Sequence, residues 1–306
     1  LTMLKGVIDS PDIPLNVSRS YLQADGNVKK ISSYITRKVA DKLKSLFTNN
    51  REDFQNKWND IKIVLEYGML TDEKFYEKAN DFVLYPTTEG QYYTLSELKE
   101  AIKANQTDKN DTLVVLYAQN KEQQYTAIEE AKAKGYQVLL LDSPIVSHLI
   151  QKLEEKNEKL TFARVDAAPL SKLIQKDEPI LAKHSEEEKN TLKADIEKVL
   201  PKEGYMVQIE DLDSDDTPFV INQPEFMRRM KEMSATGGGG MFGAFPEMYH
   251  VVVNANAPLA DAILAAPDEA AKEKLIKQAF DLARLSQGLL KGKELSEFVK
   301  RNWEIC

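Results

Sequence analysis

The chain has 306 residues, of which 42% are hydrophobic, so it is long enough and apolar enough to form about two domains with real cores. Its formal net charge is −8 and its sequence pI is near 5.2, which argues against nucleic acid as a partner because phosphates would be repelled. The single cysteine, Cys306, excludes an intramolecular disulfide, and no apolar run approaches the roughly 20 residues that cross a bilayer.

These properties favour a cytoplasmic protein without a membrane partner. The chain begins at Leu1, without an initiator methionine, on residues that resemble the end of a strand. We therefore expect the chain to be a fragment of a longer protein.

Residues 6–23, GVIDSPDIPLNVSRSYLQ, predict a stiff loop. Pro11 and Pro14 each fix φ and lack an amide donor, which excludes regular structure in the first half of the loop. The apolar residues around them favour anchoring, and they are Val7, Ile8, Ile13, Leu15 and Val17. Such a loop could hold Arg19 towards an anion on another surface, and a guanidinium suits phosphate well. The alternative is that Arg19 is simply solvated or paired within the structure.

Residues 27–82 predict a coil of three consecutive helices. Apolar residues recur at helical spacing from Val28 to Phe47, and a second helix carries Phe54 to Leu65 and ends near Gly68. Thr71 is the expected N-cap of the third helix. This coil is either a rigid spacer or ordinary helical core, and the two interpretations are compatible.

Residues 92–165 predict a small αβα layer. Thr94 and Glu97 have the spacing of a capping box, and two apolar runs at 112–118 and 136–142 flank a helix over 121–134. A strand, helix and strand at this spacing indicate parallel strands. The turn after the first strand contains no glycine and cannot cradle a pyrophosphate, so the layer is expected to be structural.

Residues 166–183 are expected to form a linker, with a domain boundary near Lys183. A second capping box at Ser185 starts a helix that runs to Leu200, and 205–210 with 219–221 predict a β-hairpin around an acidic loop. The loop resembles a calcium loop in its spacing, but Asp216 replaces the required glycine and Asn222 the required glutamate. We therefore predict a solvated turn and no metal site.

Five of the eight methionines lie between Pro224 and Met248, beside the four glycines 237–240. A short helix there would place apolar side chains on one side, with Arg228, Arg229 and Lys231 keeping it soluble. The segment is either ordinary core or a contact for unspecific apolar partners, for which flexible, polarizable side chains are suited. The candidate contact residues are Phe226, Met227, Met230, Met233 and Phe242.

The tail predicts a strand over 249–254, a helical segment from Pro258 to about Gly288 that Pro267 can break, and a helix over 295–303. Its apolar face looks too wide to be covered by a small sheet, so we expect burial against a second chain. The expected dimerisation residues are Leu275, Ile276, Ala279, Phe280 and Ala283.

The loop at 6–23 closely resembles the catalytic loop in the middle domain of the ninety-kilodalton heat-shock chaperones, in their bacterial form. Residues 92–97 (YYTLSE) and 138–142 (VLLLD) resemble further middle-domain segments. One departure is the helix after Asp142, where the acidic and aromatic residues usual in bacterial relatives are replaced by Ser147 and His148.

The resemblance implies that Arg19 reaches the terminal phosphate of ATP, which is bound with magnesium in a separate N-terminal domain. Asn16 and Gln23 correspond to polar positions of the same loop, and Ile13 and Leu15 to its contact with the ATP-binding domain. The resemblance also implies that client proteins, which are non-native polypeptides, bind at the methionine-rich helix, and that the chain dimerises through its last helices. Because the nucleotide-binding domain would lie elsewhere, this chain alone is not expected to hold a cofactor or hydrolyse ATP.

The predicted fold is mixed α+β and α/β: a three-helix coil and a small αβα layer, then an α+β dimerisation domain ending in helices. Residues 1–183 would form the later middle domain and 184–306 the dimerisation domain. The predicted function is that of an ATP-dependent chaperone fragment, a homodimer that binds non-native proteins. The alternative is a purely structural dimerisation module. A free-standing hydrolase is disfavoured because Gly-x-Ser-x-Gly is absent and His148, His184 and His250 are scattered.

Overall fold

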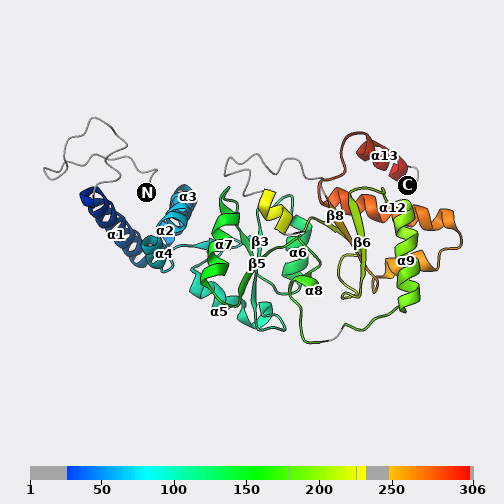
Figure 1. Cartoon of the computed structure of the whole chain (residues 1–306), viewed down its shortest axis with the longest axis horizontal. Helices are drawn as coiled ribbons and strands as arrows, with labels where there is room; N and C mark the ends of the chain where they lie inside the picture. Colours follow the sequence, from blue (N-terminus) through cyan, green and yellow to red (C-terminus); the bar gives the residue numbers. More distant parts are fainter. Residues whose placement is uncertain (1–25, 179, 225, 232–247, 304–306) are drawn as a thin grey trace.

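The computed structural model describes residues 26–178, 180–224, 226–231 and 248–303. In Figure 1 the chain is elongated, with a helical coil at the N-terminal end, an α/β layer in the middle and a C-terminal domain at the other end. The mixed fold class predicted from the sequence is confirmed by this arrangement.

The helical coil consists of α1 (Gly26–Asn49), α2 (Arg51–Asn56), α3 (Trp58–Thr71) and α4 (Glu73–Ala79). The second predicted helix is therefore two helices, separated at Lys57. The predicted cap was also wrong, because the Asp72 carboxylate accepts from the amide of Phe75 at 3.1 Å and caps α4. Thr71 instead ends α3, and its hydroxyl donates to the carbonyl of Tyr67.

The α/β layer begins with a small antiparallel ribbon, β1 (Tyr85–Pro86) with β2 (Tyr92–Tyr93), and continues through α5 (Leu95–Gln106). The capping box at Thr94 and Glu97 is confirmed. The remaining elements alternate, and they are β3 (Leu113–Ala118), α6 (Tyr125–Ala133), β4 (Val138–Leu140), α7 (Val146–Lys156), β5 (Leu160–Arg164) and the short α8 (Leu170–Leu173).

The sheet of this layer has the strand order β4-β3-β5, and both pairings are parallel. The predicted strand-helix-strand unit is thus confirmed, while β5 was not predicted. One hydrophobic cluster extends from Phe54 and Trp58 in the coil to Leu139 and Phe162 in the sheet, so the coil and the layer share a core.

The C-terminal domain has its own hydrophobic cluster. Its elements are α9 (Glu186–Val199), β6 (Tyr205–Glu210), β7 (Phe219–Asn222), β8 (Tyr249–Asn254), α11 (Pro258–Leu264), α12 (Glu269–Ser286) and α13 (Gly292–Trp303). The capping box at Ser185 is confirmed, and the tail is interrupted around Pro267 as predicted.

The predicted hairpin of residues 205–210 and 219–221 was wrong. The strand order is β6-β8-β7, with β6 parallel and β7 antiparallel to β8. β8 takes the centre because Val251, Val252 and Val253 are all buried, so this strand needs cover on both faces and both edges.

The structure also corrects the expectation that the apolar face of the tail lies outside the chain's own core. The side chains of Ile276, Ala279, Phe280 and Ala283 are buried in the cluster of the C-terminal domain, and Leu275 packs against it while partly exposed. α12 covers its own sheet and contacts α9, which uses most of that face.

Across the ranges that the structure describes, no helix is both long and apolar enough to cross a membrane.

Candidate functional site

The site residues predicted from the sequence belong to three places in the chain: the loop at 6–23, the methionine-rich segment and the helical tail. The loop residues Ile13, Leu15, Asn16, Arg19 and Gln23 lie outside the described residues, as do Met233 and Phe242. The structure therefore bears on the helical residues 226–231, on the surfaces around them and on the tail.

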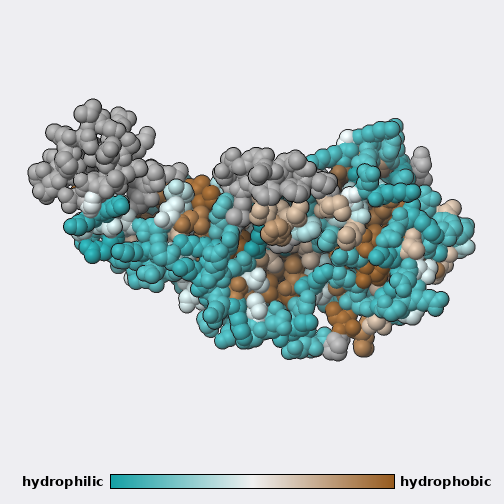
Figure 2. Space-filling view, in the orientation of Figure 1, coloured by the Kyte–Doolittle hydropathy of each residue, from teal (hydrophilic) through white to brown (hydrophobic). Residues whose placement is uncertain are grey.

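Residues 226–231 form a helical segment beside the α/β layer (Figure 1). Phe226 is 71% exposed and Met227 is 39% exposed, whereas Met230 is half-buried. We call the exposed side chains of Phe226 and Met227 the ledge. Figure 2 shows apolar surface in this region, between the α/β layer and the C-terminal domain. The ledge is the part of the predicted contact site that the structure places at the surface.

The arginines of this segment hold it to the α/β layer instead of keeping it soluble. Arg228 is only 5% exposed, and its Nη2 donates to the hydroxyl of Tyr117 at 2.7 Å. The predicted role of this side chain was wrong, because it is buried against the central strand β3.

Arg229 binds the same layer through both of its terminal nitrogens. Nη1 lies 2.7 Å from one carboxylate oxygen of Glu154 on α7, and Nη2 lies 3.3 Å from the other oxygen. Nη2 also donates to the backbone carbonyl of Phe162 on β5 at 2.7 Å. A forked contact of this kind fixes direction as well as distance.

The two residues of α7 that the sequence resemblance singled out differ from one another in exposure. Ser147 is buried, whereas His148 is half-buried. Ser147 therefore offers little surface to a partner.

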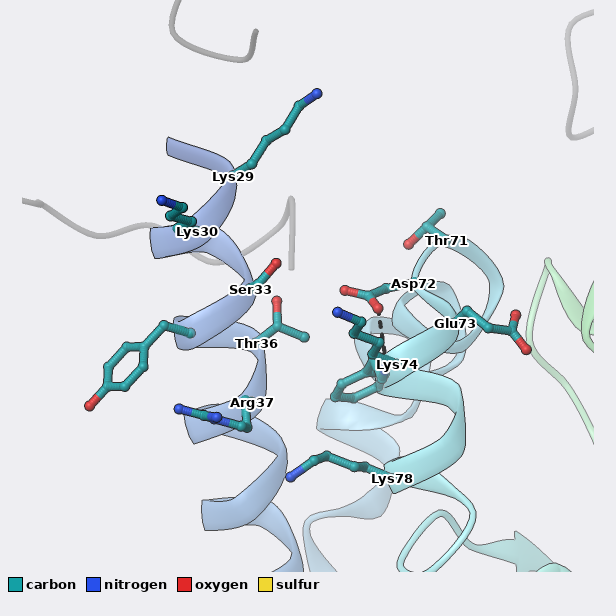
Figure 3. Close-up of a pocket in the computed structure, with 12 residues that line it drawn as sticks. Lys29, Lys30, Ser33, Thr36, Arg37, Thr71, Asp72, Glu73, Lys74 and Lys78 are labelled. Atoms are coloured by element: carbon teal, nitrogen blue, oxygen red, sulfur yellow. Dashed lines mark hydrogen bonds between the residues drawn. The ribbon is translucent and has the colours of Figure 1, made fainter. Parts of the chain in front are cut away.

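A second surface is a groove between α1 and α4 with a volume of about 890 Å³ (Figure 3). Its walls are rich in basic residues, namely Lys29, Lys30, Arg37, Lys74 and Lys78. Of the two acids in the lining, Glu73 pairs with Lys152 and Lys156 on α7, and the carboxylate of Asp72 caps α4. The groove is therefore basic and suits an anion better than an apolar ligand.

The acidic loop of residues 211–216 joins the C-terminal domain to the α/β layer. Asp216 is buried, its carboxylate lies 2.9 Å from Nζ of Lys134, and it accepts from the hydroxyl of Ser171. Lys134 also lies 3.1 Å from Asp213, and Thr217 donates to Glu130. Although partial burial works against the charged form, the hydrogen bonds to Asp216 and Asp213 raise the pKa of Lys134.

These contacts form a polar seam between the two parts of the chain, and the prediction of a merely solvated turn was wrong at Asp216. Among the residues that the structure describes, no three or more His, Cys, Asp and Glu side chains gather in a way that could hold a metal ion.

At the far end, α13 packs along α12 through polar pairs. Arg301 lies 2.6 Å from Asp281, and Gln278 donates to Asn302 at 2.8 Å. Exposed apolar residues remain on both helices: Leu282 and Leu285 on α12, and Val299 and Trp303 on α13. We call these four residues the outer stripe.

A sequence model described as Hsp90 protein matches residues 1–302. The chain belongs to the Hsp90 family. Among curated relatives, the chaperone protein HtpG of Porphyromonas gingivalis is 45% identical over 93% of this chain and 42% of its own length. That of Bacteroides fragilis is 39% identical over all of this chain and 55% of its own length. A third, from Rhodopseudomonas palustris, is 38% identical over 46% of this chain. The chain thus spans about half the length of the first two relatives.

In this Hsp90 chain the sequence pointed to the apolar half of the contact segment and missed the basic half. Arg228 and Arg229 looked like solubilising residues because their partners, Tyr117 and Glu154, lie 111 and 75 residues away. The available signal was compositional, since two adjacent arginines in a short apolar helix can pair with a carboxylate on a neighbouring helix.

Proposed function

We propose that this chain is the part of an Hsp90-family chaperone that binds non-native polypeptides and pairs with a second copy of itself. The observation that carries the proposal is the ledge, an exposed aromatic and an exposed methionine on a helical segment whose basic residues hold it to the α/β layer. The family membership and the chaperone relatives supply the context.

The chemistry of the ledge suits clients of many sequences. A phenylalanine side chain contributes a large apolar area, and methionine adapts its shape because it is unbranched and polarizable. Surfaces of this kind bind by excluding water rather than by specific hydrogen bonds, so they discriminate little among apolar segments. Exposed apolar segments are what distinguishes a non-native protein from a folded one.

The experiment that tests the ledge uses the Phe226→Ser/Met227→Ser variant of the protein that contains this chain. We expect its affinity for a reduced and alkylated, permanently unfolded protein to fall about tenfold, as measured by fluorescence anisotropy. The matched control is Leu181→Ser, which removes an 83% exposed leucine from another surface. Equal affinities of the ledge variant and the control would refute the proposal.

We further propose that the complete protein depends on ATP, bound with magnesium in a part of the protein outside these 306 residues, in the cytoplasm. Arg19, with Asn16 and Gln23 in the same loop and Ile13 and Leu15 at its contact, would stabilise charge on the transferred phosphoryl group. In the complete protein, Arg19→Ala should slow ATP turnover and leave the mass in solution unchanged. Unaltered turnover would remove Arg19 from this role.

The second candidate function, a purely structural dimerisation module, is favoured by the outer stripe, which offers apolar area at the end of the chain. Sedimentation with and without an unfolded protein separates the two functions. A chaperone co-sediments with the unfolded protein through the ledge, whereas a scaffold sediments as the same dimer in both cases.

A further inference from the structure

We propose that the ion pair of Arg229 with Glu154 and the hydrogen bond of Arg228 with Tyr117 form a clasp that positions the ledge for client binding. The inference rests on the proposed function of the ledge and goes beyond it, because it makes client affinity depend on how two parts of the chain are docked. Neither arginine is placed in contact with the client, so both are positioning residues.

The two halves of the clasp come from different parts of the fold. Arg228 and Arg229 follow β7 of the C-terminal sheet, whereas Tyr117 lies on β3 and Glu154 on α7 of the α/β layer. Just before the segment, the Asn222 side chain donates to the carbonyl of Ala167, which ties the end of β7 to the same layer. The segment that carries the ledge is therefore supported by a surface outside its own domain.

The Arg229 contact is more specific than an ordinary surface ion pair. The side chains of Arg229 and Glu154 are 19% and 22% exposed, so solvent screens the pair only in part. One Glu154 oxygen also accepts from the amide of Phe162 at 2.7 Å, which fixes the carboxylate against β5. A lysine could supply the charge but not the fork that reaches Glu154 and the Phe162 carbonyl together.

The order of the residues explains why the clasp sets the direction of the ledge. Successive residues of an α-helix are rotated by about 100°, so Arg228 and Arg229 point to one side and the pair before them to roughly the opposite side. That pair is Phe226 and Met227, which are exposed as this rotation requires. Anchoring two adjacent residues on two elements, β3 and α7, fixes the rotation of the segment about its own axis.

The consequence is a client surface that forms only in the docked arrangement. Without the clasp, Phe226 and Met227 remain in the sequence but lose their fixed orientation, and a client must then bear the entropic cost of ordering them. The affinity for a client would thus depend on how the C-terminal domain is docked against the α/β layer.

The test uses charge reversal in the complete protein, with anisotropy of a reduced and alkylated, permanently unfolded protein as the readout. Arg229→Glu and Glu154→Arg should each weaken binding about tenfold. The double variant should recover part of this loss, because it restores the ion pair but not the contacts of the two side chains with the backbone of Phe162. Arg229→Lys should show an intermediate loss. Thermal unfolding checks that each variant is folded. If the charge-reversed variants do not fold, the affinity of Arg229→Lys decides the question.

Hydrogen exchange at the amides of residues 226–231 supplies a readout that does not depend on the client. We expect Arg229→Glu to accelerate exchange there about tenfold and the double variant to reverse part of this acceleration. Failure of the double variant to recover either exchange or binding would overturn the pairing on which the clasp depends.

The two proposals fail in different ways. If Phe226→Ser/Met227→Ser loses client binding while folded Arg229→Glu and Arg229→Lys keep full affinity, the clasp is refuted and the ledge stands. If the ledge variant keeps full affinity, the client proposal is refuted, and exchange at 226–231 still shows whether Arg229 holds the segment. Accelerated exchange in Arg229→Glu without any loss of binding overturns the inference, because the segment would be loosened with no effect on the client.

Discussion

Glu66 on α3 is a buried acid whose hydrogen bonds and neighbouring charges do not offset the cost of burying its charged form. Its side chain is 6% exposed, and one of its carboxylate oxygens has no hydrogen-bond partner among the described residues. Burial raises the pKa of Glu66 to about 7, although a hydrogen bond with Ser143 and the charge of Lys62 act in the opposite direction. Nearby Asp142 adds to the increase.

We expect Glu66→Gln to remove a pH dependence of stability. Because the pKa of Glu66 is higher in the folded protein than in the unfolded chain, its contribution is most favourable below about pH 4.5 and is lost as pH rises through about 7. The free energy of unfolding of the variant, relative to the unmodified protein, should therefore rise by about 2 kcal/mol between pH 5 and pH 8. Urea unfolding at the two pH values measures this difference.

The control for that measurement is Glu77→Gln on α4, which changes an exposed carboxylate of the neighbouring helix. A difference between the Glu66 variant and the unmodified protein that stays constant from pH 5 to pH 8 would contradict the prediction.

At the residue scale, the sequence could indicate which side chains are apolar but not which polar ones are buried. Phe226 and Met227 were predicted as contact residues from composition, and the structure finds them exposed. The burial of Arg228 could not be predicted, because it depends on Tyr117 lying at the right point of a sheet. Glu66 gave no signal either, since a glutamate in a helix is ordinarily solvated.

The two capping boxes, whose signals are local, were predicted correctly, although the cap expected at Thr71 was wrong by one residue. The strand order of the C-terminal sheet, which depends on distant partners, was not predicted. The capping boxes at Thr94 and Ser185 involve residues three apart and are present in the structure. In the order β6-β8-β7, β6 pairs with β8, a strand about 40 residues further along the chain. The predicted hairpin was wrong because it paired β6 with β7, the next strand in the sequence. Strand pairing of this kind is fixed by packing and not by turn residues alone.

The contact between α3 and α4 supplies a prediction at the scale of elements. Gly68 lies inside α3, where a Cβ atom would sit 2.9 Å from two ring carbons of the buried Phe75 on α4. Alanine favours a helix over glycine by about 1 kcal/mol, but the clash exceeds this gain because the ring has no free space. Gly68→Ala should therefore lower the free energy of unfolding by about 1–2 kcal/mol in urea denaturation.

Phe75→Leu supplies the matched test, since it removes the ring that the new methyl group would meet. The double variant should be less destabilised than the sum of the two single variants by about 1 kcal/mol. If the losses in free energy of unfolding of the two single variants simply add in the double variant, the ring of Phe75 is not the reason that position 68 requires glycine.

At the scale of the whole molecule, the polar seam joins the two parts of the chain. Asp216 is buried with Lys134 and Ser171 as partners, so Asp216→Asn leaves Lys134 partly buried with only the more exposed Asp213. We expect a loss of about 2 kcal/mol in the free energy of unfolding and faster hydrogen exchange in α6 and α8. Asp215→Asn, in the same loop but exposed, is the control and should change neither quantity. Unchanged exchange in α6 and α8 would show that the seam does not hold the two parts together.

The outer stripe gives the last prediction, which concerns the assembly of the molecule. Leu282 and Leu285 are 49% and 41% exposed, and they lie on the side of α12 away from the core residues Ile276 and Ala283. We propose that they pair with Val299 and Trp303 across a two-fold axis, since exposed apolar side chains on neighbouring helices are commonly covered by a second copy. The chain should therefore sediment at twice its mass of 34.7 kDa.

Leu282→Glu/Leu285→Glu should convert the dimer to a monomer, because four carboxylates would be brought into an interface that lacks their partners. The helix itself should persist, since glutamate is a good helix former and neither leucine belongs to the buried core. The matched control, Leu181→Glu, replaces a more exposed leucine elsewhere and should leave the mass doubled. A doubled mass in the Leu282/Leu285 variant would place the interface on another surface, and a single mass in the unmodified chain at about 100 µM would remove the dimer altogether.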